Sequence, residues 1–440
     1  MEMNERMSKR FWLLGLVGLI SAGLLVACGS NYNSSTSGLV LVGSQGSSVI
    51  QTYSFNLNSG HVASIANSVN DTGNSVCLLN GLPGPMVVDP HGGYAYAILS
   101  ASSLCSKSAP GILVFQIKSD GTIAQVGSLS DPNPVSLAMD PAGKFLFVAE
   151  GTNSTAQSPN ATPCPQTSPP QYGVCVYAIG SGGALTSVSG TFSFVNGQGF
   201  QNPNIVAVAP SPTVFPGVGI NGSSNAECSV PGNSPPTSQY LYAVDANNYV
   251  VWEYSVDTST GALGNPPSAT APLHFGTDAV PAGVAVDPCD RFVYVSGSLH
   301  NKISAYTICT VKGASCSIAD GSLVAVSGSP FVVSGSANGL GPIVVDPFGN
   351  DVYAVGTLSN TLSGFRISPV TGSLTALTPA TVATGLQPKS IAVRADNSWL
   401  FVTNYGAASV SQYSIAPATG ALSVLPTITT DNYPFGVAVK

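Results

Sequence analysis

The sequence predicts an all-β fold, and three recurring patterns carry that prediction. An apolar strand, a tight turn and a second strand follow one another repeatedly, as in VAVDPCDRFVYVS at 284–296. An alternating stretch such as KISAYTI at 302–308 comes next. A Gly-containing turn such as STGAL at 259–263 then leads into a fourth short apolar run. Period-two alternation bounded by Gly-rich turns is typical of β-strands.

These patterns form a repeat of four strands, here called A (as VAVDP), B (as FVYVS), C (as ISAYTI) and D (after TGAL). The A–B segment occurs seven times, starting near residues 84, 133, 202, 280, 340, 387 and 433. In the copy at 202, strand B is delayed to 238–244, and the copy at 433 stops at the C-terminus after strand A. Four-stranded units repeated radially are the blades of a β-propeller.

The two chain ends predict how the ring closes. Residues 39–43 supply a strand B with no strand A before it, and residues 436–440 supply a strand A with no strand B after it. If the C-terminal strand A joins the N-terminal strands B–D, six internal blades and one shared blade make seven. Such closure leaves no free sheet edge. Strand A then lines the central channel, and the D–A and B–C loops share the face where propellers usually bind ligands.

The N-terminus predicts export and lipid anchoring. Residues 1–27 combine basic residues with an apolar run, which indicates a secretory signal peptide. The segment LVAC at 25–28 resembles the lipobox of bacterial lipoproteins, which implies lipid on Cys28. Residues 28–38 would then be the lipidated Cys and a flexible tether, and residues 39–440 the propeller. The expected location is extracytoplasmic, anchored to the bacterial cell envelope on its periplasmic or surface side.

Charge and composition narrow the partners. Only 8% of the residues are charged and the net charge is −7, so there is no basic patch for nucleic acid. A monomer is expected. No His-x-x-x-His, Cys-x-x-Cys or Asp-rich calcium loop occurs, so neither a metal nor a cofactor is predicted.

Eight cysteines besides Cys28 predict disulfides in an oxidising compartment. Eight cysteines allow 105 pairings, and placing each one on a face of the propeller favours four pairs. These pairs are Cys77–Cys105, Cys164–Cys175, Cys228–Cys289 and Cys309–Cys316. Two Pro- and Ser-rich insertions interrupt the repeat, at 150–173 in a B–C loop and at 211–238 in an A–B loop.

The acidic residues of the repeat have a structural interpretation. An Asp precedes Pro in four A–B turns, and in three of them Gly follows two residues after the Pro, a type I turn signature. These residues are Asp89, Asp140, Asp287 and Asp346. Asp290 stands where the other turns have Gly, and Arg291 is interpreted as a solvated neighbour.

The cores of the form P-x-x-VAVDP-x-G-x-x-x-YV and the TGAL turns resemble the lactonase-like seven-bladed propellers, a family with YVTN-like repeats. The resemblance covers about residues 39–440, and the family includes the propeller-type 6-phosphogluconolactonases. It implies an Arg-His pair at the entry to one strand A and an Asn-Glu pair after strand B. The aligned positions hold Gly341 and Pro342, then Gly356 and Thr357, so the chain departs from the family pattern at its catalytic residues.

A weaker catalytic set remains on the D–A/B–C face, where a His could act as base with a carboxylate to orient it. Its members are His300, Lys302, Glu150, Asp245 and His274. The alternative interpretation, which we favour, is that they are solvated loop residues.

Two functions therefore stay open. The first is a membrane-tethered propeller without catalysis that binds a glycan, peptide or envelope protein at the channel mouth. The second is hydrolysis of a sugar lactone, as the resemblance to 6-phosphogluconolactonases implies. Lys302 and Lys389 are the lysines that offer positive charge to a phosphate on this face.

Overall fold

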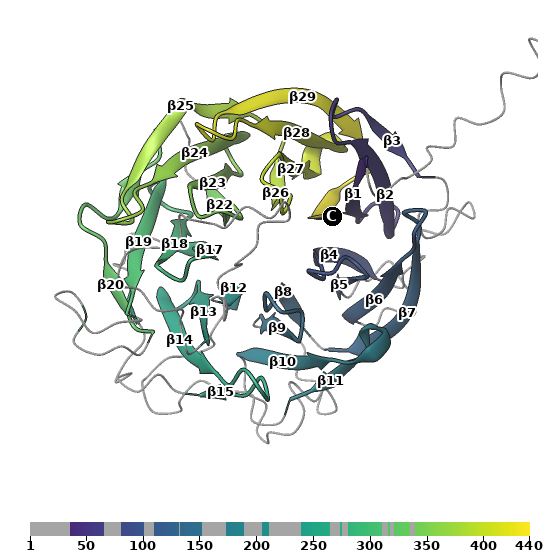
Figure 1. The fold of residues 1–440 in the computed structure, drawn as a ribbon, viewed down its shortest axis with the longest axis horizontal. Helices are drawn as coiled ribbons and strands as arrows, with labels where there is room; N and C mark the ends of the chain where they lie inside the picture. Colours follow the sequence, from purple (N-terminus) through teal and green to yellow (C-terminus); the bar gives the residue numbers. More distant parts are fainter. Residues whose placement is uncertain are drawn as a thin grey trace, which may run out of the picture.

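The computed structural model describes residues 36–65, 81–100, 110–131, 133–151, 173–188, 205–210, 239–264, 273–274, 280–309, 316, 321–334 and 339–440. These residues form seven antiparallel sheets arranged radially around a channel, as predicted (Figure 1). Strands β4, β8, β12, β17, β22, β26 and β30 lie innermost. The last strand of each blade lies at the rim (Figure 1).

Each blade follows the predicted order A to D. Blade 1 contains β4 (Leu82–Val88), β5 (Tyr94–Ser100), β6 (Gly111–Ile117) and β7 (Ile123–Ser130). Blade 2 contains β8 (Pro134–Met139), β9 (Phe145–Glu150), β10 (Val174–Ile179) and β11 (Leu185–Ser187). Blade 3 contains β12 (Ile205–Pro210), β13 (Gln239–Asp245), β14 (Val250–Val256), β15 (Leu263–Gly264) and β16 (Leu273–His274).

Blade 4 contains β17 (Pro281–Val286), β18 (Phe292–Gly297), β19 (Lys302–Ile308), β20 (Leu323–Ala325) and β21 (Phe331–Val332). Blade 5 contains β22 (Leu340–Val345), β23 (Asp351–Gly356), β24 (Thr361–Ile367) and β25 (Leu374–Ala383). Blade 6 contains β26 (Pro388–Val393), β27 (Trp399–Asn404), β28 (Ser409–Ile415) and β29 (Leu422–Thr429). Blade 7 contains β30 (Pro434–Val439), β1 (Ser37–Ser44), β2 (Val49–Asn56) and β3 (Val62–Ser64).

Blade 7 closes the ring. Strand β30 pairs antiparallel with β1, with Leu41 opposite Ala438 and Val42 opposite Val437. The purple start and the yellow end of the described chain therefore lie in one sheet (Figure 1). The predicted closure is confirmed.

The hydrophobic core lies between adjacent blades. Tyr306 of β19 packs in a cluster with side chains of blade 3, and Phe365 of β24 packs in a cluster with side chains of blade 4. Tyr413 of β28 packs in a cluster with side chains of blade 5. All three are less than 10% exposed, because period-two alternation sends every second residue of a strand into an interface with the next blade.

A turn–strand contact recurs at the blade interfaces. The Gly of each TGAL-type turn has a positive φ, and it lies against the first residues of strand B in the preceding blade. A Cβ on Gly183 would meet the ring of Tyr94 at 2.7 Å, and one on Gly261 would meet Phe145 at 2.5 Å. Glycine is therefore required twice over, by its backbone conformation and by the close approach.

Buried tyrosine hydroxyl groups complete this contact. Tyr294 of β18 donates to the carbonyl of Gly372 at 3.0 Å, and Tyr353 of β23 donates to that of Gly420 at 2.8 Å. Burial raises the pKa of Tyr294, which keeps its hydroxyl protonated as a donor. The same hydrogen bond joins Tyr96 to the turn of blade 2 and Tyr242 to the turn of blade 4.

The aspartates of the A–B turns accept backbone hydrogen bonds. The carboxylate of Asp140 accepts from the N–H groups of Lys144 and Phe145, both at 2.6 Å. Asp346 accepts from the N–H of Asn350 at 2.7 Å. Each such aspartate fixes a turn on the face that carries the A–B and C–D loops, hereafter the lower face.

Arg291 corrects one expectation. It is 8% exposed and not solvated, since its guanidinium makes a two-pronged ion pair with Asp287 at 2.7 and 2.9 Å. Its Nη2 also donates to the carbonyl of Gly349 in blade 5 at 3.0 Å. Asp290 takes the left-handed turn position, with φ 55°, that Gly349 takes with φ 72° in the next blade. The charged cluster of this turn therefore links two blades.

One of the four predicted disulfides lies wholly within the described residues, and it joins Cys309 to Cys316. Cys175 and Cys289 are also disulfide-bonded. Their predicted partners Cys164 and Cys228, the pair Cys77–Cys105 and residues 1–35 with Cys28 lie outside the described residues, as do most of the two insertions. Among the described residues, no helix is long and apolar enough to cross a membrane.

The turn glycines yield a graded stability prediction. Gly372→Ala should lower the free energy of unfolding by at least about 2 kcal/mol, because strain at φ 71° adds to a clash with Phe292. Gly182→Ala is the matched control: it has φ 73° but open space around it, so strain alone should cost about 1 kcal/mol. Urea denaturation of both variants measures this, and equal losses would contradict a steric role for the turn.

The buried ion pair yields a second prediction. Arg291→Met should cost about 3–5 kcal/mol, because it leaves the Asp287 carboxylate buried without its cation. The double variant Asp287→Asn/Arg291→Met should recover part of that loss. Arg394→Met serves as control, since its pair with Asp396 is partly exposed and should contribute less than about 1 kcal/mol. Denaturant midpoints of the three variants and wild type decide whether Arg291 acts as a buried partner.

Candidate functional site

The predicted site residues lie on the face formed by the D–A and B–C loops, hereafter the upper face. His300 is exposed in the loop between β18 and β19 and has a left-handed backbone, φ 66°. Lys302 opens β19 and is half-buried. His274 lies in β16, which pairs with β14. Glu150 and Asp245 end the B strands of blades 2 and 3.

Glu150 and Asp245 are not solvated loop residues, which corrects the interpretation favoured above. Asp245 is fully buried, and its carboxylate braces its own B–C turn. It accepts from the backbone N–H of Asn247 at 3.0 Å and from Nδ2 of Asn248 at 2.7 Å. Asp245 is thus committed to the turn of blade 3.

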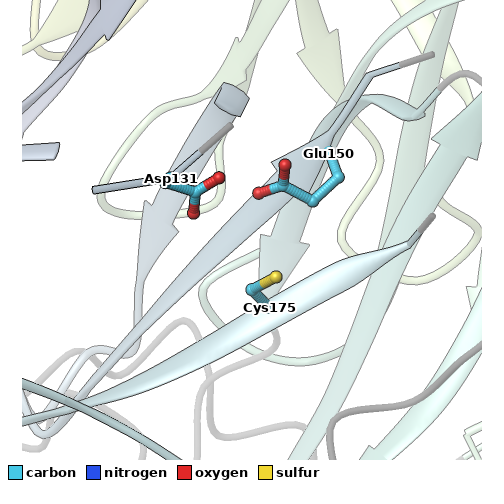
Figure 2. A group of neighbouring side chains, drawn as sticks. All are labelled: Asp131, Glu150 and Cys175. Atoms are coloured by element: carbon cyan, nitrogen blue, oxygen red, sulfur yellow. The ribbon is translucent and has the colours of Figure 1, made fainter. Parts of the chain in front are cut away.

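Glu150 belongs to a buried pair of carboxyl groups. Asp131, which follows β7 in the D–A loop, points toward Glu150 at the end of β9, and Cys175 of β10 lies beside them (Figure 2). One ligand-type atom of each of these three residues lies within 4.8 Å of the others. Asp131 and Glu150 are each 2% exposed. The hydroxyl of Tyr177 donates to Asp131 Oδ2 at 2.9 Å.

Both carboxyl groups of the pair have raised pKa values. Burial, and then the negative charge of Asp131, raises the pKa of Glu150 well above its ordinary value. Burial also raises the pKa of Asp131. Among the described residues, Asp131 Oδ1 and Glu150 Oε1 accept no hydrogen bond from a neighbouring group. A proton shared between the two carboxyl groups satisfies both oxygens and removes one of two buried like charges.

Cys175 does not turn this pair into a metal centre. Its sulfur is in a disulfide, and metals are bound by the thiolate. Two carboxylates remain, fewer than the four ligands of a structural zinc site or the six to eight oxygens of calcium. The arrangement is therefore suited to holding or transferring a proton.

A second group of side chains, of which the sequence analysis named only Lys389, lies on the upper face beside β26 and β30. Tyr405, after β27, and Tyr433, before β30, stack with ring centroids 5.0 Å apart. Phe435 of β30 meets Tyr405 edge-on at 6.3 Å. The ammonium group of Lys389, at the start of β26, lies 6.0 Å from the centroid of Tyr405, a cation–π distance. We call these four residues the mouth cluster.

The mouth cluster is presented to solvent on a fixed backbone. Tyr433 is 50% exposed, although its ring is apolar on both faces. Its φ of 59° is rare for an aromatic residue, and its carbonyl accepts from the N–H of Gln45 in blade 7 at 3.0 Å. The N–H of Tyr405 donates to the carbonyl of Gln387 at 3.0 Å. Such strain is characteristic of functional positions.

The second half of the chain carries the family signature. Residues 233–438 match the family model described as lactonase, 7-bladed beta-propeller. The chain is a seven-bladed β-propeller whose second half is similar to this family. No curated protein matches the chain.

Solved structures are similar to the fold of nearly the whole chain. The periplasmic gluconolactonase of Pseudomonas aeruginosa aligns with a TM-score of 0.63 and 16% identity, covering 92% of this chain and 99% of that one. A Bacteroides fragilis protein assigned as a 6-phosphogluconolactonase aligns with a TM-score of 0.62 and 16% identity, covering 93% and 99%. A Lactobacillus plantarum protein aligns with a TM-score of 0.62 and 16% identity, covering 92% of this chain and 99% of that one. At this identity the similarity establishes the fold.

The carboxyl pair predicts a stability difference that depends on pH. Because the pKa of Glu150 is raised in the fold, the folded protein keeps a proton that the unfolded chain releases above about pH 4.3. Stability therefore falls as the pH rises, by at most about 1.4 kcal/mol per pH unit. Glu150→Gln should remove this loss, so the variant should gain stability relative to wild type between pH 5 and pH 8.

Urea denaturation at pH 5, 6, 7 and 8 tests this prediction. Asp120→Asn is the control, because Asp120 is exposed and hydrogen bonds from Thr122 lower its pKa, so its difference from wild type should stay constant above pH 5. A Glu150→Gln difference that is also constant over this range would contradict the shared proton.

Proposed function

We propose that this protein is a membrane-tethered, extracytoplasmic propeller that binds a ligand or an envelope partner at the channel mouth, without lactonase activity. The observation that carries this proposal is the mouth cluster. An exposed Tyr433 packed on a partly buried Tyr405 beside a cation is the kind of surface that contributes most to binding, because rigid aromatic side chains lose little entropy. Lys389 adds a preference for negatively charged ligands.

The residues at the family's catalytic positions support binding without catalysis. Gly341 uses its carbonyl to accept a hydrogen bond from the Ser296 hydroxyl at 2.6 Å. Thr357 donates its hydroxyl to the carbonyl of Gly339 at 2.6 Å. Pro342 and Gly356 have no titratable group. These four positions therefore offer neither a general base nor a charge for an oxyanion.

The tether rests on Cys28 and on redox chemistry. A lipid on Cys28 would hold the propeller at the envelope, since each buried methylene contributes about 0.8 kcal/mol. The disulfides at Cys175, Cys289 and Cys309–Cys316 fit an oxidising compartment. The tether at 28–38 would leave the upper face free to meet an envelope partner.

A second candidate function, lactone hydrolysis, is favoured by one observation. Glu150 ends a strand B, near the position where the family's acid follows its strand, and burial and the charge of Asp131 raise its pKa, which favours its acid form. In such a reaction water would add to the lactone carbonyl and the ring C–O bond would break. The ring oxygen would receive a proton from Glu150, and Asp131 would accept the proton lost by water. A P. aeruginosa protein of the same fold is described as a gluconolactonase.

Binding and turnover measurements on the mature protein separate the two candidates. We expect no acceleration of hydrolysis for gluconolactone or its 6-phosphate. On an array of envelope glycans and displayed peptides, we expect binding that weakens at least tenfold in Lys389→Ala/Tyr405→Ala. Lys118→Ala, which removes a lysine from a C–D turn on the lower face, should bind normally. Lactone turnover that disappears in Glu150→Gln would contradict the binding proposal.

A further inference from the structure

We propose that the upper face over blades 4 to 7 is a docking surface for an acidic protein segment that carries aliphatic side chains. This inference rests on the proposed binding function and names the partner class. The surface extends outward from the mouth cluster over four consecutive blades. We infer a protein partner because the surface combines exposed aliphatic side chains with a few positive charges.

Exposed apolar side chains gather on this one face. Of the eight large hydrophobic residues that are most exposed among the described residues, five lie in upper-face loops or at their edges. They are Leu299 (42% exposed), Val332 (63%), Leu358 (71%), Leu386 (57%) and Tyr433 (50%). Exposed apolar residues that gather on one face mark interaction sites, whereas scattered single ones do not.

The loops that carry these side chains are tied to one another. The N–H of Gln387, next to Leu386, donates to the side-chain carbonyl of Asn360 in the loop that carries Leu358, at 2.8 Å. The N–H of Gly406 donates to the carbonyl of Leu386 at 3.0 Å. Val332 pairs with Lys302 in the register of β19 and β21. The surface is therefore built in advance of binding, which lowers the entropic cost of association.

Among the described residues of blades 4 to 7, the upper face has two lysines and one partly exposed carboxyl group, whereas the whole chain is acidic. The chain has a net charge of −7, but the described lysines on the upper face are Lys302 and Lys389, and Lys389 is exposed. The carboxyl groups of Asp131, Glu150 and Asp245 are buried there. The partly exposed Asp431 accepts a hydrogen bond from the Ser47 hydroxyl at 2.7 Å. Complementary charge therefore selects an acidic partner.

A lipid surface fits these observations less well than a protein. Binding to anionic membranes uses clusters of four to eight basic residues, and the described upper face has two lysines. Interfacial tryptophans are typical of membrane contact, but Trp252 and Trp399 are both buried. Spaced Leu, Val and Tyr side chains with a polar surround are instead the composition of a protein interface.

A displayed library of random 12-residue peptides is the probe that tests this inference on the mature protein. Selected peptides should contain more Asp and Glu than Lys and Arg, together with Leu, Ile or Phe. Synthetic copies should bind at least tenfold more weakly to Leu358→Asp/Leu386→Asp, measured by fluorescence polarisation. The matched control is Val370→Asp/Val424→Asp, which changes exposed apolar residues outside this face and should bind within twofold of wild type.

Three results would overturn the inference. The first is a selection that yields no specific peptide or only basic ones. The second is equal binding by Leu358→Asp/Leu386→Asp and wild type. If Lys389→Ala/Tyr405→Ala weakens binding in that case, the proposed binding at the mouth cluster stands, but the proposal of a wider docking surface is wrong. The third is sedimentation with phosphatidylglycerol vesicles that Leu358→Asp/Leu386→Asp abolishes, which would make the occupant a membrane. Urea denaturation verifies that each variant is folded.

Discussion

The contact between a left-handed turn glycine and strand B of the preceding blade is the constraint on which the ring depends. It recurs from Gly183 against Tyr94 to Gly60 against Trp399, and each instance sets the spacing between two blades. Where strand B carries Phe401 in place of Tyr, the side-chain amide of Gln412 donates to the carbonyl of Gly60 instead, at 2.9 Å. A ring closes only if every interface keeps nearly the same angle, and at this interface a different side chain supplies the hydrogen bond that tyrosine supplies at four others.

The fold could be predicted because this constraint repeats. Each TGAL turn and each Asp-Pro turn is local in sequence, and seven copies fix both the strand order and the phase of the two ends. Only one member of the carboxyl pair could be predicted from the sequence. Glu150 was a candidate, but Asp131 lies in a loop that reaches Glu150 only because β8 and β9 pair. Arg291 was misread because its partners include Gly349, 58 residues away. The mouth cluster repeats nowhere and has no sequence signal.

The two faces consequently divide structural and functional roles. On the lower face, the carboxylates of Asp140 and Asp346 accept hydrogen bonds from backbone N–H groups of their turns. Arg291 links two neighbouring turns. On the upper face the loops differ in length and composition from blade to blade. Exposed side chains there, such as Leu358 and Tyr433, have no evident structural duty, because the core between the blades is already complete beneath them. Selection on binding can therefore act at the upper face with little effect on folding.

The last residue of strand B shows how far that freedom extends. Seven equivalent positions at the upper end of the blades hold Ser44, Ser100, Glu150, Asp245, Gly297, Gly356 and Asn404. Asp245 accepts from its own loop and Asn404 donates to Ser411 of β28, whereas Glu150 lies beside the buried carboxyl group of Asp131. The Asn-Glu pair that the family resemblance implies falls at Gly356 and Thr357, neither of which has a carboxyl group. The same strand position therefore carries a different neighbourhood, burial and chemistry in each blade, although the fold around it repeats.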